Sequence, residues 1–490
     1  MATQTRVGRA ELIERMVGVL GAEGVISGRE QLRTYECDGL TSHRVVPDLV
    51  VLPETRDQVR EVVRICHALR IPFVARGSGT GLSGGALPVE NGVLIVLSRM
   101  RRILSIDIPN QRVTVEPGVI NLAVTRAVAA DGYYYAPDPS SQLVCSIGGN
   151  VAENSGGAHC LKYGFTVNHV LALEVVLPDG ELVHLGGPTA DPIGYDLTGA
   201  FVGSEGTLGI VTAVTLRIVR RPESVRLLLA AFPSPDEAGA AVSGIIAAGI
   251  IPAAVEMMDA LAIEAAEAAA QAGYPPNAGA VLIVELDGPA AEVEHQFGHV
   301  ERICRENAAT EVRIARDEEE RARMWKGRKA AFAAVGRISP SYYVQDGVIP
   351  RTALPVVLRK IAALARERGV RVANVFHAGD GNLHPLVLYD DRIAGQAEHG
   401  AAVAAEILHI CLEHGGSITG EHGVGADKKG YMPAMFSDDD LQTMQRLRCA
   451  FDPDHLCNPG KVFPTPRLCG EVPGPHRPHP LQQAGLAEIF

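Results

Sequence analysis

Apolar residues recur at two spacings along this chain, and the spacing predicts where helices and strands lie. Near the N-terminus they return every three or four residues, the period of a helix with one buried face. We therefore expect a helical arm over residues 1–42. The apolar positions of its buried face are Leu12, Ile13, Met16, Val17 and Leu20.

Residues 43–222 alternate short apolar runs with glycine-rich loops, which is typical of a strand-rich domain. A helix at 121–130 and a hairpin around Pro178-Asp179-Gly180 are also expected. The expected strands cover residues 45–53, 71–75, 92–97, 112–116, 170–177 and 182–185. A helix before the second of these strands has a buried face of Val59, Val62, Val63, Cys66 and Leu69.

The pattern changes near Arg220-Arg221-Pro222, and residues 223–465 alternate strands with longer helices. This predicts a second domain of α/β or α+β type. Strands are expected at 227–232, 255–259 and 280–286, and helices at 236–248 and 317–335. Residues 466–490, which include a proline- and histidine-containing stretch, are expected to form a flexible tail.

The composition is that of an ordinary globular protein, with 47% hydrophobic and 21% charged residues. Lys and Arg number 45 against 57 Asp and Glu, a net charge of -12 that argues against general nucleic-acid binding. The nine cysteines form no CxxC pair, so we expect free thiols and no iron–sulfur cluster. Neither a secretory signal nor a membrane-spanning apolar run is expected.

The stretch from Arg76 to Gly85 holds five glycines in ten residues and directly follows an apolar strand. Without side chains to keep a ligand away, its N–H groups can converge on an anion. No Lys-Ser/Thr pair closes it, and its helix precedes the strand, so it is neither a P-loop nor the usual dinucleotide fingerprint. Glycine content alone leaves open a pyrophosphate cradle and a flexible surface loop.

Two further glycine-rich stretches lie in the same domain, Ser146 to Gly157 and Gly203 to Ile210. One such loop is easily structural. Three in one strand-rich domain favour backbone packed along an extended ligand.

A second group of candidate residues lies in the C-terminal half. Residues 371–377 and 383–388 read as two strands around a turn, which would bring His377 and His384 together. Two such imidazoles are half of a metal site or a buried hydrogen-bonded pair, and Glu421 would complete a His-His-Glu triad. The adjacent His422 is a candidate general base, although a Glu-His dipeptide in a loop is equally a solvated turn.

Arg328 lies between Trp325 and Phe332 on one face of the helix expected at 317–335. An arginine in an aromatic stripe either extends to solvent or faces a pocket, where its planar fork suits a carboxylate. The pattern alone favours the first alternative.

The three glycine-rich stretches resemble the flavin-binding domain of the vanillyl-alcohol-oxidase/p-cresol methylhydroxylase family. The resemblance implies an α+β FAD-binding domain. It places the pyrophosphate against Arg76, Gly77, Ser78, Gly79, Thr80, Gly81, Ser83, Gly84 and Gly85. It places the rest of the FAD against Pro137, Asp138, Ser146, Gly149, Asn150, Asn154, Gly156, Gly206, Ile210 and Asn458. Several relatives bond flavin through a histidine that matches Thr80 here, so non-covalent FAD is expected.

The segments at 377–385, 421–422 and 451–461 resemble the C-terminal domain of flavin-dependent 2-hydroxy-acid dehydrogenases. These include D-lactate, D-2-hydroxyglutarate and bacterial glycolate dehydrogenases; the FAD-bearing subunits of the last match residues 325–340 in detail. In these enzymes this domain caps the substrate site and its C-terminal segment returns to the flavin. The implied metal ligands are His377, His384 and Glu421, with zinc as the expected ion.

By the same resemblance His422 is the general base, and Arg328 and Asn382 hold the substrate. The hydroxyglutarate enzymes have a lysine that matches Val344 here, and its loss favours a short monocarboxylate. The expected reaction is oxidation of glycolate to glyoxylate, with D-lactate as the runner-up substrate. A non-catalytic scaffold subunit is the rival from another class.

The chain has no cysteine pattern of an iron–sulfur cluster. The electrons taken from the substrate must therefore pass to another carrier. The resemblance implies a second flavin-type subunit and an iron–sulfur subunit that pass them to quinone. We therefore expect a cytoplasmic chain, held at the inner membrane by its partners.

Overall fold

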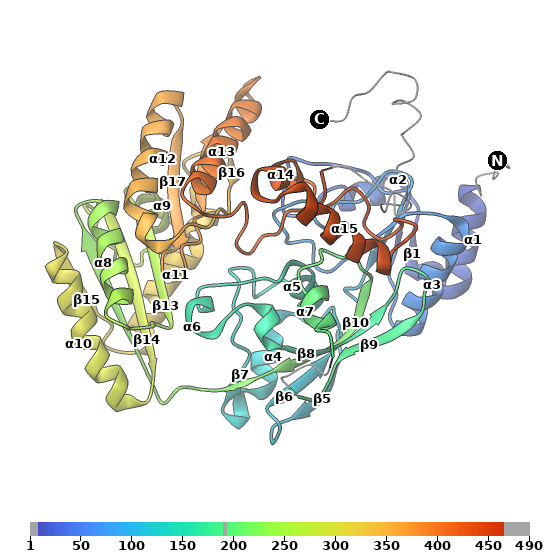
Figure 1. The fold of residues 1–490 in the computed structure, drawn as a ribbon, viewed down its shortest axis with the longest axis horizontal. Coiled ribbons are helices and arrows are strands. Elements are labelled where there is room, and N and C mark those ends of the chain that lie inside the picture. The colour runs from blue at the N-terminus through green and yellow to red at the C-terminus, as the bar shows by residue number, and fades with distance from the viewer. Residues whose placement is uncertain (1–7, 190–193, 465–490) are drawn as a thin grey trace.

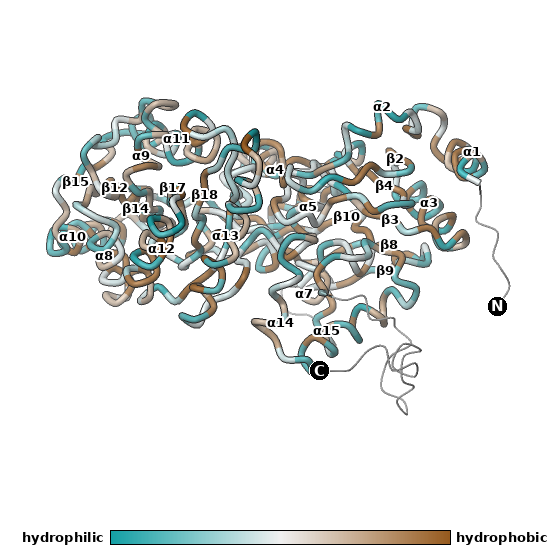
Figure 2. The backbone as a smooth tube through the Cα atoms, turned by 90° about the horizontal axis from the view of Figure 1, so that it is seen from above, coloured by the Kyte–Doolittle hydropathy of each residue, from teal (hydrophilic) through white to brown (hydrophobic). Residues whose placement is uncertain are grey.

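The computed structural model describes residues 8–189 and 194–464, which form two lobes joined near residue 222 (Figure 1). In Figure 2 the hydrophobic stretches run mostly through the interior of each lobe. The flexible tail expected at 466–490 lies outside the described residues. None of the helices in residues 8–189 and 194–464 has the length and apolar character that a membrane span requires.

The first sheet of the N-terminal lobe has four strands in the order β1-β2-β4-β3. Its strands are β1 (Val25–Ile26), β2 (Leu49–Val51), β3 (Phe73–Arg76) and β4 (Val93–Val96). Its helices are α1 (Arg9–Leu20), α2 (Arg29–Leu32) and α3 (Arg56–Leu69). The hydroxyl of Thr55 caps α3, and Val59, Val62, Val63 and Cys66 are buried as their spacing predicts. The segment expected as a helical arm also contributes β1 to this sheet.

The second sheet of this lobe is antiparallel, in the order β5-β6-β10-β8-β9. The hairpin expected around the turn at residues 178–180 is confirmed, because β8 pairs with β9. The strands are β5 (Ile103–Asp107), β6 (Arg112–Val115), β8 (Val170–Val176), β9 (Leu182–Gly186) and β10 (Ile210–Arg217). A separate pair joins β7 (Tyr133–Tyr134) to β11 (Val219–Arg220). The helices are α4 (Asn121–Val128), α5 (Ile147–Glu153), α6 (Cys160–Tyr163) and α7 (Leu197–Phe201).

The C-terminal lobe is built on an antiparallel sheet of seven strands, in the order β15-β12-β14-β13-β17-β18-β16. They are β12 (Ser224–Phe232), β13 (Ala254–Asp259), β14 (Ala280–Gly288), β15 (Glu311–Ile314), β16 (Ser341–Val344), β17 (Arg371–His377) and β18 (Pro385–Tyr389). Helices α8 (Pro235–Ala247), α10 (Ala290–Glu306), α12 (Leu354–Arg368) and α13 (Gln396–Glu413) pack on one face. Helices α9 (Ala260–Ala270) and α11 (Glu318–Val335) pack on the other.

The end of the chain returns to the N-terminal lobe. Helices α14 (Met432–Met435) and α15 (Asp438–Phe451) lie over that lobe in Figure 1. Beyond them, Phe73 donates its N–H to the carbonyl of Leu456, and Asn458 donates to that of Phe73, each at 2.8 Å. The returning segment thus pairs with β3, the strand that leads into the first glycine-rich loop. The expected α+β fold with a returning C-terminal segment is confirmed.

Candidate active site

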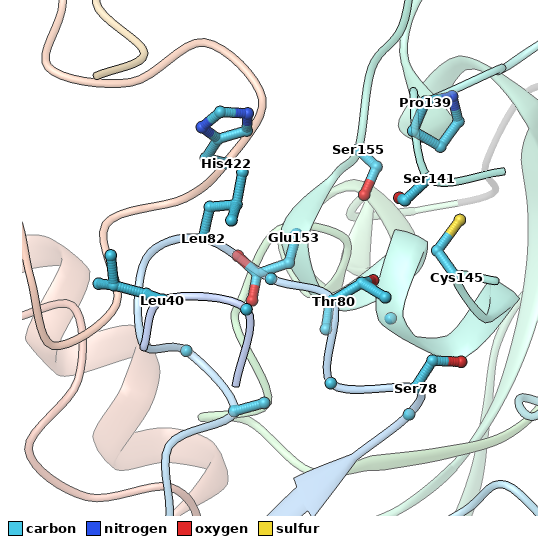
Figure 3. Close-up of a pocket in the computed structure, with 18 of the residues that line it drawn as sticks. Leu40, Ser78, Thr80, Leu82, Pro139, Ser141, Cys145, Glu153, Ser155 and His422 are labelled. Carbon is cyan, nitrogen blue, oxygen red and sulfur yellow. The ribbon is translucent and has the colours of Figure 1, made fainter. Parts of the chain in front are cut away.

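A cavity of about 830 Å³ is lined by residues of both lobes. All three glycine-rich stretches contribute to it, as do His384, Glu421 and His422 from the C-terminal lobe. Figure 3 shows Ser78 and Thr80 of the first loop, Ser155 of the second with Cys145 just before it, and His422 around this cavity. The candidate cofactor and substrate residues therefore meet in one place.

The first loop presents unused backbone donors. The N–H groups of residues 78–82 donate no hydrogen bond within the described part of the chain. The loop also packs closely on the second one, since a Cβ on Gly77 would lie 2.0 Å from the hydroxyl of Ser146. Free N–H groups beside close backbone packing fit an anionic, phosphate-bearing ligand.

Most of the expected FAD contacts line this cavity: Arg76, Gly77, Ser78, Gly79, Thr80, Gly81, Gly85, Ser146, Gly149, Asn150, Gly206 and Ile210. The others, Ser83, Gly84, Pro137, Asp138, Asn154, Gly156 and Asn458, are not among its lining residues. Asn458 connects two loops from behind, because its amide donates to the carbonyls of Gly85 at 2.9 Å and Glu205 at 2.6 Å. Asn154 ends α5 in a left-handed conformation and accepts a hydrogen bond from Val167 N at 2.9 Å.

His377, His384 and Glu421 form a buried cluster at the cavity. Nε2 of His377 lies 3.1 Å from Oε1 of Glu421, and Nε2 of His384 lies 3.3 Å from the same oxygen. The two imidazole centroids are 5.1 Å apart, so the predicted hairpin does bring them together. Neither ring nitrogen of His384 has a hydrogen bond of normal geometry among the described residues. This donor set and its unsatisfied imidazole fit a divalent cation.

Asp346, with His384 and His422, offers a second donor set for a cation. Its carboxylate is already engaged, because it accepts from the backbone N–H groups of Gly420, Glu421 and His422 at 2.8–3.3 Å. The hydroxyl of Thr419 also donates to it. Asp346 thus holds the 419–422 turn, and the geometry favours His377, His384 and Glu421 as the ligand set.

The charges in this cluster are strongly coupled. Burial alone would lower the pKa of His377, but the carboxylates of Glu256 and Glu421 hold it well above its usual value. Burial would raise the pKa of Glu421, but His377 and His384 hold it well below its usual value. The carboxylate is therefore ionised and available to a cation at neutral pH.

His422 stacks on His384, with the ring centroids 4.9 Å apart and the planes 6° from parallel. Burial lowers the pKa of His422 to about 4, against the opposing effect of Asp346. Its imidazole is unprotonated at neutral pH and lines the cavity, as a general base requires.

Arg328 is buried and does not extend to solvent, contrary to what the helix pattern alone favours. Its Nε and Nη2 lie 2.8 and 2.6 Å from Oε2 of Glu256. Asn382 is also buried, and its side-chain amide has no hydrogen-bond partner in the described part of the chain. Phe332 and Val344 line the cavity.

Sequence reasoning gave no role to Glu256, Asp346 or Glu205. Glu256 interrupts an apolar strand, and that buried charge was the available signal. Glu205 lies in the third glycine-rich stretch and accepts from the N–H groups of Val424 and Gly425 at 2.7 and 2.6 Å. That contact joins loops far apart in the sequence, and no local pattern encodes it.

Comparison with known proteins agrees with this geometry. Residues 47–186 match an FAD binding domain, and residues 221–462 match the C-terminal domain of FAD linked oxidases. The chain is 53% identical to glycolate oxidase subunit GlcD of Escherichia coli strain K12, over 92% of this chain and 90% of that protein. The chain belongs to the FAD-linked oxidase family. The first two glycine-rich stretches, Arg76 to Gly85 and Ser146 to Gly157, lie within the residues matched by the FAD binding domain.

Other relatives of this FAD-linked oxidase carry two different names. It is 41% identical to glycolate oxidase subunit GlcD of Bacillus subtilis, over 92% of this chain and 96% of that protein. It is 32% identical to a probable mitochondrial D-lactate dehydrogenase of Danio rerio, over 92% of each chain. These relatives support the conclusion that this chain is an FAD-dependent 2-hydroxy-acid dehydrogenase.

The solved structure of p-cresol methylhydroxylase with substrate bound matches the fold with a TM-score of 0.79. It covers 94% of this chain and 98% of that one at 16% identity. The predicted p-cresol methylhydroxylase-type fold is thereby confirmed.

Proposed function

We propose that this protein oxidises a short 2-hydroxy acid with FAD, converting glycolate to glyoxylate. The observation that carries the proposal is one cavity lined both by the glycine-rich loops and by His384, Glu421 and His422. Its most similar curated relatives reported above are named glycolate oxidase subunits.

The FAD would be held without a covalent bond, because Thr80 stands where several relatives carry the bonding histidine. The N–H groups of residues 78–82 would receive the pyrophosphate. When bound, FAD supplies the acceptor for the hydride of the substrate.

A divalent cation, with zinc as our expectation, would be held by His377, His384 and Glu421. When bound, it supplies a positive charge that lowers the pKa of the substrate hydroxyl.

The protein's own residues would orient the substrate and move its proton. Arg328 donates a hydrogen bond from Nε to Glu256, its Nη2 lies 2.6 Å from the same oxygen in an ion pair, and no hydrogen bond engages its Nη1 among the described residues. That nitrogen and the unpartnered amide of Asn382 are the donors proposed for the substrate carboxylate. The unprotonated His422 would accept the hydroxyl proton as Cα gives up its hydride.

The substrate is expected to be small and to carry one carboxylate. Val344 lines the cavity at the position that matches a lysine of the hydroxyglutarate enzymes. Without that lysine, no cation at this position would pair with a second carboxylate of the substrate. D-lactate remains the second candidate, since a relative is named as a probable D-lactate dehydrogenase. One methyl group in a pocket changes affinity by only about 1–3 kcal/mol.

The relatives are named as subunits, which supports a multi-subunit complex. We propose that a second flavin-type subunit and an iron–sulfur subunit take the electrons on to quinone. Such partners would hold this cytoplasmic chain at the inner membrane.

The experiment is anaerobic reduction of the FAD-loaded protein by glycolate, followed by flavin bleaching. His422→Ala should slow bleaching about 10²- to 10⁴-fold. The control His295→Ala changes an exposed histidine on α10 and should react like wild type. If the flavin of His422→Ala bleaches at the wild-type rate, His422 is not the general base.

The same assay separates an enzyme from a scaffold. Isolated protein that reduces a dye with glycolate or D-lactate is an enzyme, whereas one that binds FAD but reduces nothing with either is a scaffold. Undiminished turnover after complete removal of metal would exclude the cation from the reaction.

A further inference from the structure

We infer that Glu256 is a positioning residue, whose single carboxylate fixes both His377 and Arg328. This inference rests on the proposed function, because His377 is there a metal ligand and Arg328 a substrate-binding group. Glu256 is 1% exposed, and its two carboxylate oxygens face His377 and Arg328, so it acts through these two side chains.

The register of the sheet places Glu256 beside its first partner. Strands β13 and β17 pair antiparallel, and Glu256 is the direct cross-strand neighbour of His377. Oε1 of Glu256 lies 2.7 Å from Nδ1 of His377. A carboxylate opposite an imidazole in a buried sheet is held by two backbones and has little room to move.

This contact decides which nitrogen of His377 faces the cluster. An ionised carboxylate only accepts, so Nδ1 of His377 carries the proton that it donates to Glu256. With Nδ1 engaged by Glu256, the nitrogen left to bind a cation is Nε2, which lies 3.1 Å from Oε1 of Glu421. Glu256 therefore sets both the orientation and the tautomer in which His377 can bind a cation.

The other oxygen of the same carboxylate holds Arg328. Oε2 accepts a hydrogen bond from Nε at 2.8 Å and lies 2.6 Å from Nη2 in an ion pair, and both side chains are almost fully buried. The guanidinium compensates the buried negative charge, and Glu256 in turn fixes the direction in which Nη1 points. One carboxylate thus links the cation ligand to the group proposed for the substrate carboxylate.

The experiment titrates Zn²⁺ by calorimetry into FAD-loaded protein from which metal has been removed by chelation. We expect Glu256→Gln to raise the Kd for Zn²⁺ about 10- to 100-fold, the usual cost of losing such a partner. Glu256→Asp keeps the charge on a shorter arm and should give an intermediate Kd, which serves as the test if the glutamine variant does not fold.

The matched control is Asp259→Asn on the same strand. Asp259 is also a hydrogen-bonded carboxylate, since it accepts from Ala262 N and Asn374 N at 2.9 Å, but it contacts no residue of the cluster. The Asp259→Asn variant should bind Zn²⁺ with the wild-type Kd. A second measurement at saturating Zn²⁺ should show a KM for glycolate raised about tenfold in Glu256→Gln, with kcat changed less, because Arg328 is released.

Each outcome has one meaning. Equal Kd and KM values for wild type and Glu256→Gln would overturn the positioning role, and so would an equal loss of Zn²⁺ affinity in Asp259→Asn. If wild-type protein oxidises glycolate but binds no Zn²⁺, the inference fails while the proposed oxidation stands. If it binds Zn²⁺ with the predicted difference between variants but oxidises neither acid, the proposed function fails and the contact stands.

Discussion

Gly156 of the N-terminal lobe lies directly against the carboxylate of Glu421 in the C-terminal lobe. A Cβ built on Gly156 would be 2.6 Å from Oε2 of Glu421 and 2.7 Å from the ring of Phe165. Its backbone is outside the positive-φ region, so what this position requires is the absence of a side chain. The two lobes therefore meet at a glycine beside Glu421, a proposed cation ligand.

Gly156→Ala should displace Glu421 and weaken the cation site. We expect the Kd for Zn²⁺ to rise at least about tenfold, a loss of ~1.4 kcal/mol or more. The measurement is Zn²⁺ calorimetry with flavin content determined on the same sample. Gly430→Ala is the control, since a Cβ there meets nothing within 4 Å and should leave Zn²⁺ affinity unchanged.

Glu205→Ala should loosen the loop that carries Glu421 and His422. The N–H groups of Val424 and Gly425 lose their buried acceptor, at a cost of about 1–3 kcal/mol each. We expect a lower melting temperature together with slower flavin bleaching by glycolate.

The control for that variant is Glu116→Ala. Glu116 is a buried carboxylate of the same lobe that accepts from Arg102 N at 2.7 Å. The Glu116→Ala variant should have a lower melting temperature, but glycolate should bleach its flavin as fast as in the wild type. Equal slowing in both variants would mean that Glu205 has no specific effect on the loop.

His159 joins the lobes as a charged bridge, with Nδ1 2.9 Å from Asp138 and Nε2 3.1 Å from Glu285. Burial would lower the pKa of His159, but these carboxylates hold it well above its usual value. The raised pKa means that the stabilisation is complete below about pH 6.5 and is lost as pH rises through the folded-state value.

His159→Gln should therefore lower the free energy of unfolding most at low pH. We expect the wild-type protein to exceed the variant by about 3 kcal/mol in free energy of unfolding at pH 6. Urea unfolding at a series of pH values should show this difference shrinking under alkaline conditions. A difference that is constant with pH would mean that the bridge carries no charge.

The flavin should dissociate on denaturation, because Thr80 offers no nitrogen for a covalent link. Acid precipitation should leave the FAD absorbance in the supernatant and a colourless pellet. Flavin retained in the washed pellet would show attachment elsewhere in the chain.

Periodicity was enough to predict most elements and the hairpin that brings His377 and His384 close together. The helix face of α3 is encoded locally, because its apolar residues repeat at the helical period. The strand expected at 45–53 is shorter, since only Leu49–Val51 is assigned as strand within that range. Apolar residues there suit a buried extended segment whether or not it pairs with a neighbour.

Sequence patterns did not predict the polar residues that hold the site's side chains in place. Asp346 holds the 419–422 turn from more than seventy residues away, and Glu256 meets His377 only through sheet register. Arg328 shows the limit most clearly, because a helical face predicts its neighbours on the helix but not the carboxylate on another strand. Family resemblance named the proposed ligands, and only the three-dimensional arrangement showed which residues hold their side chains in place.

Residues 456–458 pair with β3, and Asn458 ties Gly85 to Glu205. The ribosome must therefore deliver almost the whole polypeptide before these loops acquire their final spacing. We therefore expect flavin uptake late in biosynthesis, because a chain interrupted before Asn458 lacks the contacts that set the spacing of its FAD-binding loops.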